Sequence, residues 1–336
     1  MKIFNKYVTI SVLLLLPIFL FFLSFLMGRF PISPLEVILT LLSPLNSDFT
    51  VSPAISSIVF NIRLPRIIAA MLVGASLAIA GAAFQGIFRN PLVSSDILGV
   101  SAGSGLGACL AILLSAGNWM IQILAFLFGM ISVSITYIIS KSYKTGGILV
   151  LVLCGIAISA FCNALISGAK FIADPYDKLP QITYWLMGSL SSITIDNLLV
   201  VTIPIFLGII VLLLLRWKLN VLAMGDEEAQ SLGVNPQKFR VIIITVCTLV
   251  TAAAVSVSGI IGWVGLLIPH ITRMIVGPDH KELLPASLSI GASFLLLIDN
   301  ISRTAIAIEI PIGILTSIIG VPIFLYLLRR GYSQWS

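Results

Sequence analysis

Long apolar runs alternate with short polar connections along the whole chain. A run of about 20 apolar residues is long enough to cross a membrane as a helix, and the pattern predicts ten such segments. They are roughly residues 8–27, 62–85, 96–115, 119–140, 147–169, 193–215, 240–258, 265–277, 283–303 and 311–329. The third and the eighth are short and are rich in glycine or broken by proline, so we expect them to cross only part of the bilayer.

Composition agrees with this pattern, because 59% of the 336 residues are hydrophobic and only 10% are charged. A soluble domain is typically about 25% charged, so this chain has too little polar surface to remain in water. The first apolar run is longer than the core of a secretory signal and lacks a small-x-small cleavage site after it, so we interpret it as a retained span. The predicted fold class is an all-α polytopic membrane protein with about ten transmembrane helices.

Basic residues around the spans set the predicted orientation, since Lys and Arg accumulate on the cytoplasmic side of a membrane. With the N-terminus inside, the cytoplasmic side holds 13 of the 19 basic residues: Lys2, Lys6, Arg89, Lys141, Lys144, Arg216, Lys218, Lys238, Arg240, Arg273, Lys281, Arg329 and Arg330. The outer side holds the other 6: Arg29, Arg63, Arg66, Lys170, Lys178 and Arg303. We therefore expect both termini in the cytoplasm, and we attribute the net charge of +6 to this bias rather than to a nucleic-acid partner.

The two halves of the chain, about 1–190 and 191–336, resemble each other weakly. Gly81, Pro91 and Gly99 recur at a fixed offset of 178 residues as Gly259, Pro269 and Gly277. Five spans in each half would give the halves opposite orientations, which is the inverted repeat of many transporter folds. The pattern predicts a transporter.

The stretch "GDEEAQSLGVNPQKFR", residues 225–240, is the most densely charged part of the chain and lies on the predicted cytoplasmic side. Three acidic residues in a row favour a helix N-terminus, and Gly233 suits the left-handed position that ends a helix. Asn235 followed by Pro236 suits the start of the next helix. We expect a short helix, a tight turn and a second helix that continues into the seventh span; an ordinary solvated loop is the alternative.

Small residues at four-residue spacing mark two further segments. Gly99, Gly103 and Gly107 favour close packing of two helices over a phosphate cradle, and no G-x-x-x-x-G-K-[ST] motif occurs in the chain. In the fifth span the stripe consists of Gly155, Ser159, Asn163 and Ser167. These four residues either form interhelical hydrogen bonds or line an aqueous path.

Charged residues inside the spans are few, and only Asp299 and Arg303 are spaced to pair on one helix face. A proton-driven secondary carrier would need a chain of buried carboxylates, and an intramembrane enzyme would need a paired nucleophile and base, so neither class is favoured. The four cysteines lie in apolar runs without a C-x-x-C pair, and the chain has two histidines. We expect neither catalytic residues nor a metal site.

Four segments closely resemble the FecCD-type permeases, the membrane subunits of ABC importers for iron–siderophore complexes, haem and vitamin B12. They are "RLPRIIAAMLVGASLAIAGAAFQGIFRNPLVSSDILGVSAGSGLG", "EEAQSLGVNP", "GWVGLLIPHITRMIVGPDHKELLP" and "EIPIGILTSIIGVPIFLYLL". The resemblance implies a fold like the vitamin B12 importer permease, in the plasma (inner) membrane of a prokaryote. It also implies a second permease copy, identical or paralogous, two ATPase subunits that bind ATP and Mg, and an external substrate-binding protein. No cofactor is expected in this chain itself.

The resemblance also assigns roles to individual residues. The coupling helices, which seat on the ATPase, match about 221–236, with the contact residues Gly225, Asp226, Glu227, Glu228, Ala229, Ser231, Leu232, Gly233 and Val234. Arg63, Arg66 and Arg303 match arginines that, in the vitamin B12 importer, meet acidic residues of the binding protein. Interfacial snorkelling, or for Arg303 a pair with Asp299, is the alternative. The stripe on the fifth span becomes the predicted translocation path.

The predicted function is import of an iron chelate of the siderophore or haem class. The segment "ADPYDKLPQITYWLMGSL" also looks like permeases assigned to molybdate or tungstate, so these oxyanions and vitamin B12 stay open as cargo.

Overall fold

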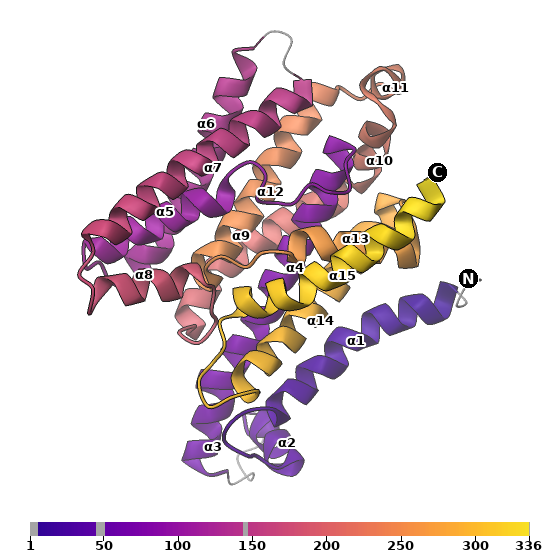
Figure 1. Ribbon diagram of the computed structural model, residues 1–336. Helices are drawn as coiled ribbons and strands as arrows, with labels where there is room; N and C mark the ends of the chain where they lie inside the picture. Colours follow the sequence, from indigo (N-terminus) through magenta and orange to yellow (C-terminus); the bar gives the residue numbers. More distant parts are fainter. Residues whose placement is uncertain (1–5, 45–50, 144–146, 336) are drawn as a thin grey trace.

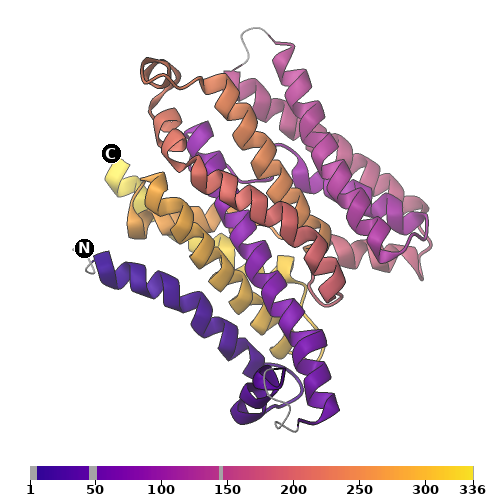
Figure 2. The ribbon, with the colours of Figure 1, turned by 180° about the vertical axis from the view of Figure 1, so that it is seen from behind.

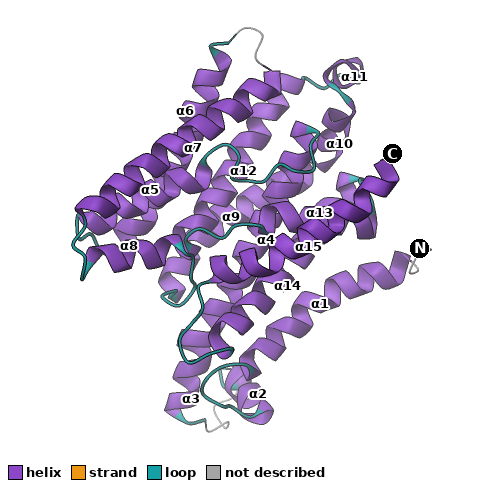
Figure 3. Ribbon diagram, viewed as in Figure 1, coloured by secondary structure: helices purple, strands orange, loops and turns teal. Residues whose placement is uncertain are grey.

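The computed structural model describes residues 6–44, 51–143 and 147–335, and these residues form helices and connections without a strand (Figure 3). The long helices are α1 (Lys6–Leu26), α4 (Leu64–Phe88), α6 (Asn118–Lys141), α7 (Gly147–Ile172), α9 (Ile195–Leu214), α12 (Pro236–Ser258), α14 (His280–Thr304) and α15 (Ile312–Trp335). The shorter helices are α2 (Pro34–Leu42), α3 (Pro53–Ser57), α5 (Val100–Leu113), α8 (Lys178–Leu186), α10 (Arg216–Met224), α11 (Asp226–Ser231) and α13 (Val264–Val276). A π-helical turn, η1 (Ile58–Arg63), joins α3 to α4.

Every predicted apolar segment falls on a helix. Among the described residues six helices are long and apolar enough to cross a membrane: Pro53–Phe88, Asn118–Lys141, Ile148–Ile172, Ile195–Leu214, Pro236–Ser258 and His280–Thr304. The other four segments fall on shorter apolar helices: Ser11–Leu26, Val100–Leu113, Val264–Val276 and Ile312–Leu327. The all-helical, multi-pass class is therefore confirmed, whereas the number of ten spans stays a prediction. At about 1.5 Å per residue, α5 and α13 are each about 20 Å long, shorter than the ~30 Å hydrocarbon core.

Helix α4 occupies the centre of the molecule (Figure 1). In the continuous helical span Pro53–Phe88 that contains it, 83% of the most apolar 18-residue stretch is buried. Its glycines allow the neighbouring backbones to approach: a Cβ atom at Gly74 would overlap the carbonyl oxygen of Gly291 in α14. A Cβ atom at Gly81 would overlap the carbonyl oxygen of Gly265 in α13 in the same way. Such contacts between small residues replace the hydrophobic effect as the source of helix association in a membrane.

The glycines of α5 have the packing role that their spacing predicts. A Cβ atom at Gly103 would lie 2.6 Å from the carbonyl oxygen of Phe128, and one at Gly107 would overlap that of Leu124. Both carbonyls belong to α6. Gly99 has a different role, because it precedes α5 with φ +89°, a conformation that glycine adopts without strain.

The residue pairing at an offset of 178 is wrong. Gly81 lies within α4 and Gly259 directly after α12, while Pro91 lies in a connection and Pro269 within α13. The cause is the unequal length of two connections: residues 89–99 join α4 to α5, whereas residues 259–263 join α12 to α13. No constant offset can align both pairs of helices.

Both ends of the chain lie at the same end of the molecule as α10 and α11 (Figures 1 and 2). We call this the hairpin end, because the helical hairpin of residues 225–236 lies there. Helices α2, α3 and α8 lie at the opposite end. The two termini therefore share one side, as the distribution of basic residues predicts.

Candidate functional site

The hairpin, residues 225–236, has the structure that its sequence predicts. Helix α11 carries Asp226, Glu227 and Glu228 in its first turn, and Gly233 follows it with φ +75°. Asn235 then caps α12, because its Oδ1 accepts the Lys238 amide at 3.0 Å, and Pro236 occupies the first turn. The ordinary solvated loop is excluded by these two helices and their caps.

The inner side of the hairpin is fixed to the body of the protein. Ala229 is fully buried and Val234 is 4% exposed, whereas Leu232 is 52% exposed on the outer side. Arg240 of α12 donates from Nη2 to the Asp226 carboxylate at 2.8 Å and so joins α11 to α12. The hairpin therefore presents an exposed surface on a rigid base.

Helix α10, which leads into the hairpin, is joined to α14. The Asn220 side chain donates to Asp279 Oδ1 at 2.6 Å, and its own oxygen accepts the His280 amide at 2.8 Å. The Lys281 amide and the Asn220 side chain, which both donate to the Asp279 carboxylate, hold the pKa of Asp279 below its ordinary value. The hairpin is thus joined to α12 directly and to α14 through α10.

The predicted stripe on α7 is not uniform. Gly155 is buried, and a Cβ atom there would overlap the carbonyl oxygen of Ile97, in the segment before α5. Ser159 and Ser167 donate to carbonyls of their own helix, at 2.8 and 2.9 Å, rather than to another helix. Asn163 and Ser167 are exposed. The stripe thus packs at one end and is free at the other.

Helix α7 is also the least buried of the six long apolar helices, since only 17% of its most apolar 18-residue stretch is covered by the rest of the chain. Several of its exposed residues are large and apolar: Leu153, Ile156, Phe161 and Leu165. An apolar helix that is uncovered within its own chain must face lipid, a second protein chain or both. In Figure 1, α7 and α15 both lie toward the viewer.

The three arginines of the opposite end are buried inside the chain. Arg66 of α4 forms an ion pair with Asp299 of α14 and another with Glu309, each at 2.9 Å. Arg63 donates to the backbone carbonyls of Phe25 and Phe30. These contacts tie α4 to α14, to the connection before α15 and to the end of α1.

Arg303 completes the arginine cluster, which consists of Arg63, Arg66 and Arg303. Its Nη2 donates to the Ser24 carbonyl at 2.9 Å and to the Asn300 side chain, and its Nε lies 3.7 Å from Asp299. The pair of Arg303 with Asp299, the alternative interpretation from the sequence, is therefore present. Docking of a binding protein by these arginines needs accessible guanidiniums, but all three side chains are under 8% exposed. Docking by these residues stays a prediction, and it requires this end of the molecule to open.

Sequence reasoning did not identify two residues of these arrangements, Asn220 and Glu309. Asn220 lies among the polar residues that follow the sixth apolar segment, and Glu309 precedes Pro311 and the last one. Each is a single polar residue whose partner is distant in the chain, so nothing in its local sequence reveals the contact.

Comparison with known proteins agrees with this geometry. The model of the FecCD transport family matches residues 14–330. A protein of Helicobacter pylori named "Probable iron chelatin transport system permease protein" is 44% identical over 277 residues, covering 82% of this chain and 84% of the relative. The molybdate import system permease protein of Haemophilus influenzae is 41% identical over 284 residues, covering 84% of each chain.

A solved structure titled "An inward-facing conformation of a putative metal-chelate type ABC transporter" superposes with a TM-score of 0.87 at 37% identity. The alignment covers 97% of this chain and all of the other. The range matched by the family model, residues 14–330, includes the hairpin, α7 and the arginine cluster. The protein therefore belongs to the FecCD transport family and is a multi-pass membrane permease of an ABC importer.

Proposed function

We propose that this permease translocates an iron chelate of the siderophore or haem class, received from an external binding protein, and that ATP hydrolysis in a separate subunit drives the step. The observation that carries this proposal is the rigid hairpin, which is fixed to α12 by Arg240 and Asp226 and to α14 through Asn220. A short helical surface of this kind suits a partner that pushes or pulls on it.

The ATPase contact consists, in this proposal, of the exposed side of the hairpin, with Glu227, Glu228, Ser231 and Leu232. ATP and Mg bind to the ATPase, since this chain has no phosphate-binding G-x-x-x-x-G-K-[ST] motif. Closure of two ATPases displaces the hairpins, and α12 and α14 move with them. The glycine contacts of α4 with α13 and α14 carry the movement into the centre as a rigid-body shift.

A second permease copy, identical or paralogous, covers the face that includes α7 and α15. The uncovered apolar surface of α7 supports this arrangement. The cargo then passes between the two copies, beside the exposed end of the stripe at Asn163 and Ser167. The hairpin end and both termini lie in the cytoplasm of a prokaryotic cell, which the 13 basic residues on that side support.

The cargo class rests on likeness. The iron chelatin relative and the metal-chelate transporter structure favour an iron chelate. Molybdate is the second candidate, because a relative of almost equal identity is named for molybdate import.

Uptake into proteoliposomes tests the proposal. Vesicles that contain the permease with its ATPase and binding protein should accumulate a radioactive ferric siderophore or haem. They should do so only when ATP is present on the side of the membrane where the ATPase lies. Molybdate in excess should not compete. Uptake of molybdate in place of any iron chelate would establish the second candidate, and uptake without ATP would overturn both.

A further inference from the structure

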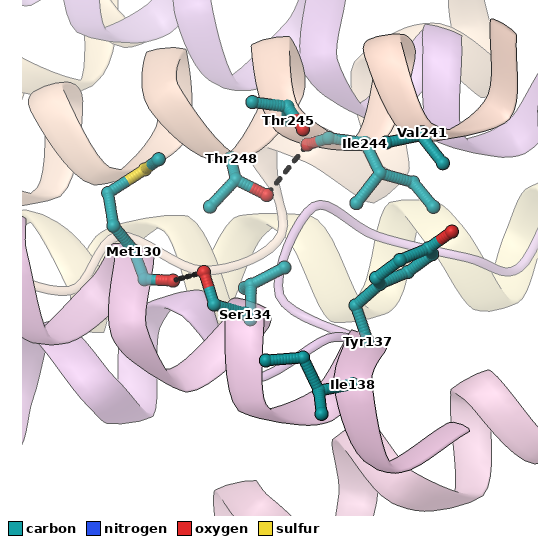
Figure 4. A pocket seen from close by; sticks show the side chains of 9 residues that line it. Met130, Ser134, Tyr137, Ile138, Val241, Ile244, Thr245 and Thr248 are labelled. Atoms are coloured by element: carbon teal, nitrogen blue, oxygen red, sulfur yellow. Dashed lines mark hydrogen bonds between the residues drawn. The ribbon is translucent and has the colours of Figure 1, made fainter. Parts of the chain in front are cut away.

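A groove lies between α6 and α12, and none of its lining residues has a role in the proposed transport cycle (Figure 4). Its volume is about 270 Å³, and its lining includes Met130, Val133 and Ile138 of α6 and Val241 and Ile244 of α12. Figure 2 shows α12 on the near side of the molecule, whereas α15 is on the near side in Figure 1. The groove is therefore on a different face from the one that we assign to a second permease copy.

The walls of the groove are apolar although hydroxyl groups line it. Ser134 donates to the Met130 carbonyl at 2.8 Å, and Thr248 donates to the Ile244 carbonyl at 2.7 Å. Both bonds are within one helix, and Figure 4 shows them as dashed lines. Because these hydroxyls are satisfied by their own backbones, they present little polarity to an occupant. The groove suits a hydrocarbon chain.

A basic pocket of about 560 Å³ continues the groove toward the hairpin end, and Tyr137 and Val241 line both. Lys141 at the end of α6 and Lys238 and Arg240 at the start of α12 line this second pocket. Of these three, only Arg240 has a carboxylate partner among the described residues. The Arg240 side chain as a whole is 18% exposed, so part of it can meet an anion in this pocket.

The two pockets follow one another in the order of a lipid headgroup and the first part of an acyl chain. From Met130 to Tyr137 the groove follows α6 for about 10 Å at 1.5 Å per residue. Tyr137, at the junction, is an aromatic residue of the kind that is enriched at membrane interfaces. Basic pockets between membrane helices on the cytoplasmic side are typical binding sites for anionic headgroups.

We propose that an anionic phospholipid binds here, with its phosphate among Lys141, Lys238 and Arg240 and one acyl chain in the groove between α6 and α12. A free phosphate would leave the groove empty, and a zwitterionic lipid would leave the positive charge of the pocket uncompensated. The bound phosphate lies beside the guanidinium of Arg240, whose Nη2 holds Asp226 of the hairpin. The lipid thereby fixes the side chain that joins α11 to α12.

Native mass spectrometry of the full-length permease in complex with its ATPase tests this site. The probes are dioleoyl phosphatidylglycerol and dioleoyl phosphatidylcholine, which share acyl chains and differ in headgroup charge. The wild-type complex should retain the anionic lipid in preference to the zwitterionic one. Each basic residue contributes roughly a fivefold gain in affinity, so K141Q/K238Q should bind phosphatidylglycerol about 30-fold more weakly.

Three further variants make the result specific. K141R/K238R should retain the lipid, and K170Q/K178Q, which removes the same charge at the opposite end, should bind it like the wild type. Ser134→Phe fills the groove without a change of charge and should also weaken retention. Equal retention of the two lipids by the wild type, or undiminished phosphatidylglycerol binding by K141Q/K238Q, would overturn the proposal. Loss of the ATPase from K141Q/K238Q with the lipid still bound would assign the pocket to the protein partner instead.

Discussion

Replacing Asp299 with Asn should destabilise the protein more than any other single loss of charge at the end of the molecule opposite the hairpin. The Asp299 side chain is fully buried, with Arg66 at 2.9 Å and Arg303 at 3.7 Å. Both arginine side chains are 7% exposed. The substitution keeps the shape and removes the charge, so it leaves two buried cations with the partly exposed Glu309 as their nearest remaining carboxylate.

Breaking one partner out of a buried ion pair costs about 3–5 kcal/mol. For a chain of 336 residues, an unfolding entropy of about 2.1 cal/mol/K per residue gives about 0.7 kcal/mol/K. The Tm should therefore fall by roughly 4–7 °C, since the shift is the free-energy loss divided by this entropy. Thermal unfolding of the purified permease in detergent, followed by circular dichroism, measures it.

Glu309→Gln is the matched control. Glu309 pairs with the same Arg66 at 2.9 Å, but its side chain is 25% exposed, and Arg66 keeps Asp299 in this variant. A pair that solvent reaches contributes about 0–1 kcal/mol, so the Tm should fall by less than about 2 °C. A Tm for Asp299→Asn within 1 °C of the wild type, or a larger loss for Glu309→Gln, would refute the assignment of Asp299 as the central charge of the cluster.

Two more substitutions test the hairpin and the α7 stripe. Gly233→Val places a β-branched residue at φ +75° with open space around its Cβ, at a backbone cost of about 1–2 kcal/mol. It should impair ATP-driven uptake while the complex still assembles. The control variant Gly117→Val, also in open space but with φ −65°, should transport normally, and equal activity of the two variants would refute the role of the turn. In a background without the four native cysteines, Asn163→Cys should react with a water-soluble maleimide at a rate that changes with nucleotide. Gly155→Cys, which lies against Ile97, should stay unreactive. If neither cysteine reacts, α7 does not line the translocation path.

Local signals in the sequence predicted the hairpin correctly because each of them acts within one turn. Three acids favour the N-terminus of α11, a glycine adopts the left-handed turn, and Asn235 with Pro236 begins α12. The positions of the apolar helices were predictable for a similar reason, since a span is defined by a continuous run. Helix α2 also has a local signal that was overlooked, a capping box in which Ser33 and Glu36 satisfy each other's backbone amides.

The contacts of the arginines could not be derived in this way. Arg66 and Asp299 are 233 positions apart in the chain, and only the packing of α14 against α4 brings them together. Sequence position correctly gave Arg63, Arg66 and Arg303 a shared end of the molecule, but it carried no information on burial. The residue pairing at an offset of 178 failed for a related reason: it assumed a constant spacing, whereas the connection from α4 to α5 is longer than the one from α12 to α13. The inverted repeat itself stays a prediction.

Site-specific cross-linking from the hairpin tests the central proposal, that this surface receives the ATPase. In the background without native cysteines, Leu232→Cys and Tyr176→Cys each carry a benzophenone maleimide. Leu232 directly follows α11 at the hairpin end and is 52% exposed, whereas Tyr176 lies just before α8 at the opposite end and is 93% exposed. Illumination of the assembled transporter should link the ATPase to position 232 and not to position 176. Capture of the ATPase from position 176, or no capture from position 232 in a complex that still hydrolyses ATP and transports its cargo, would contradict the account.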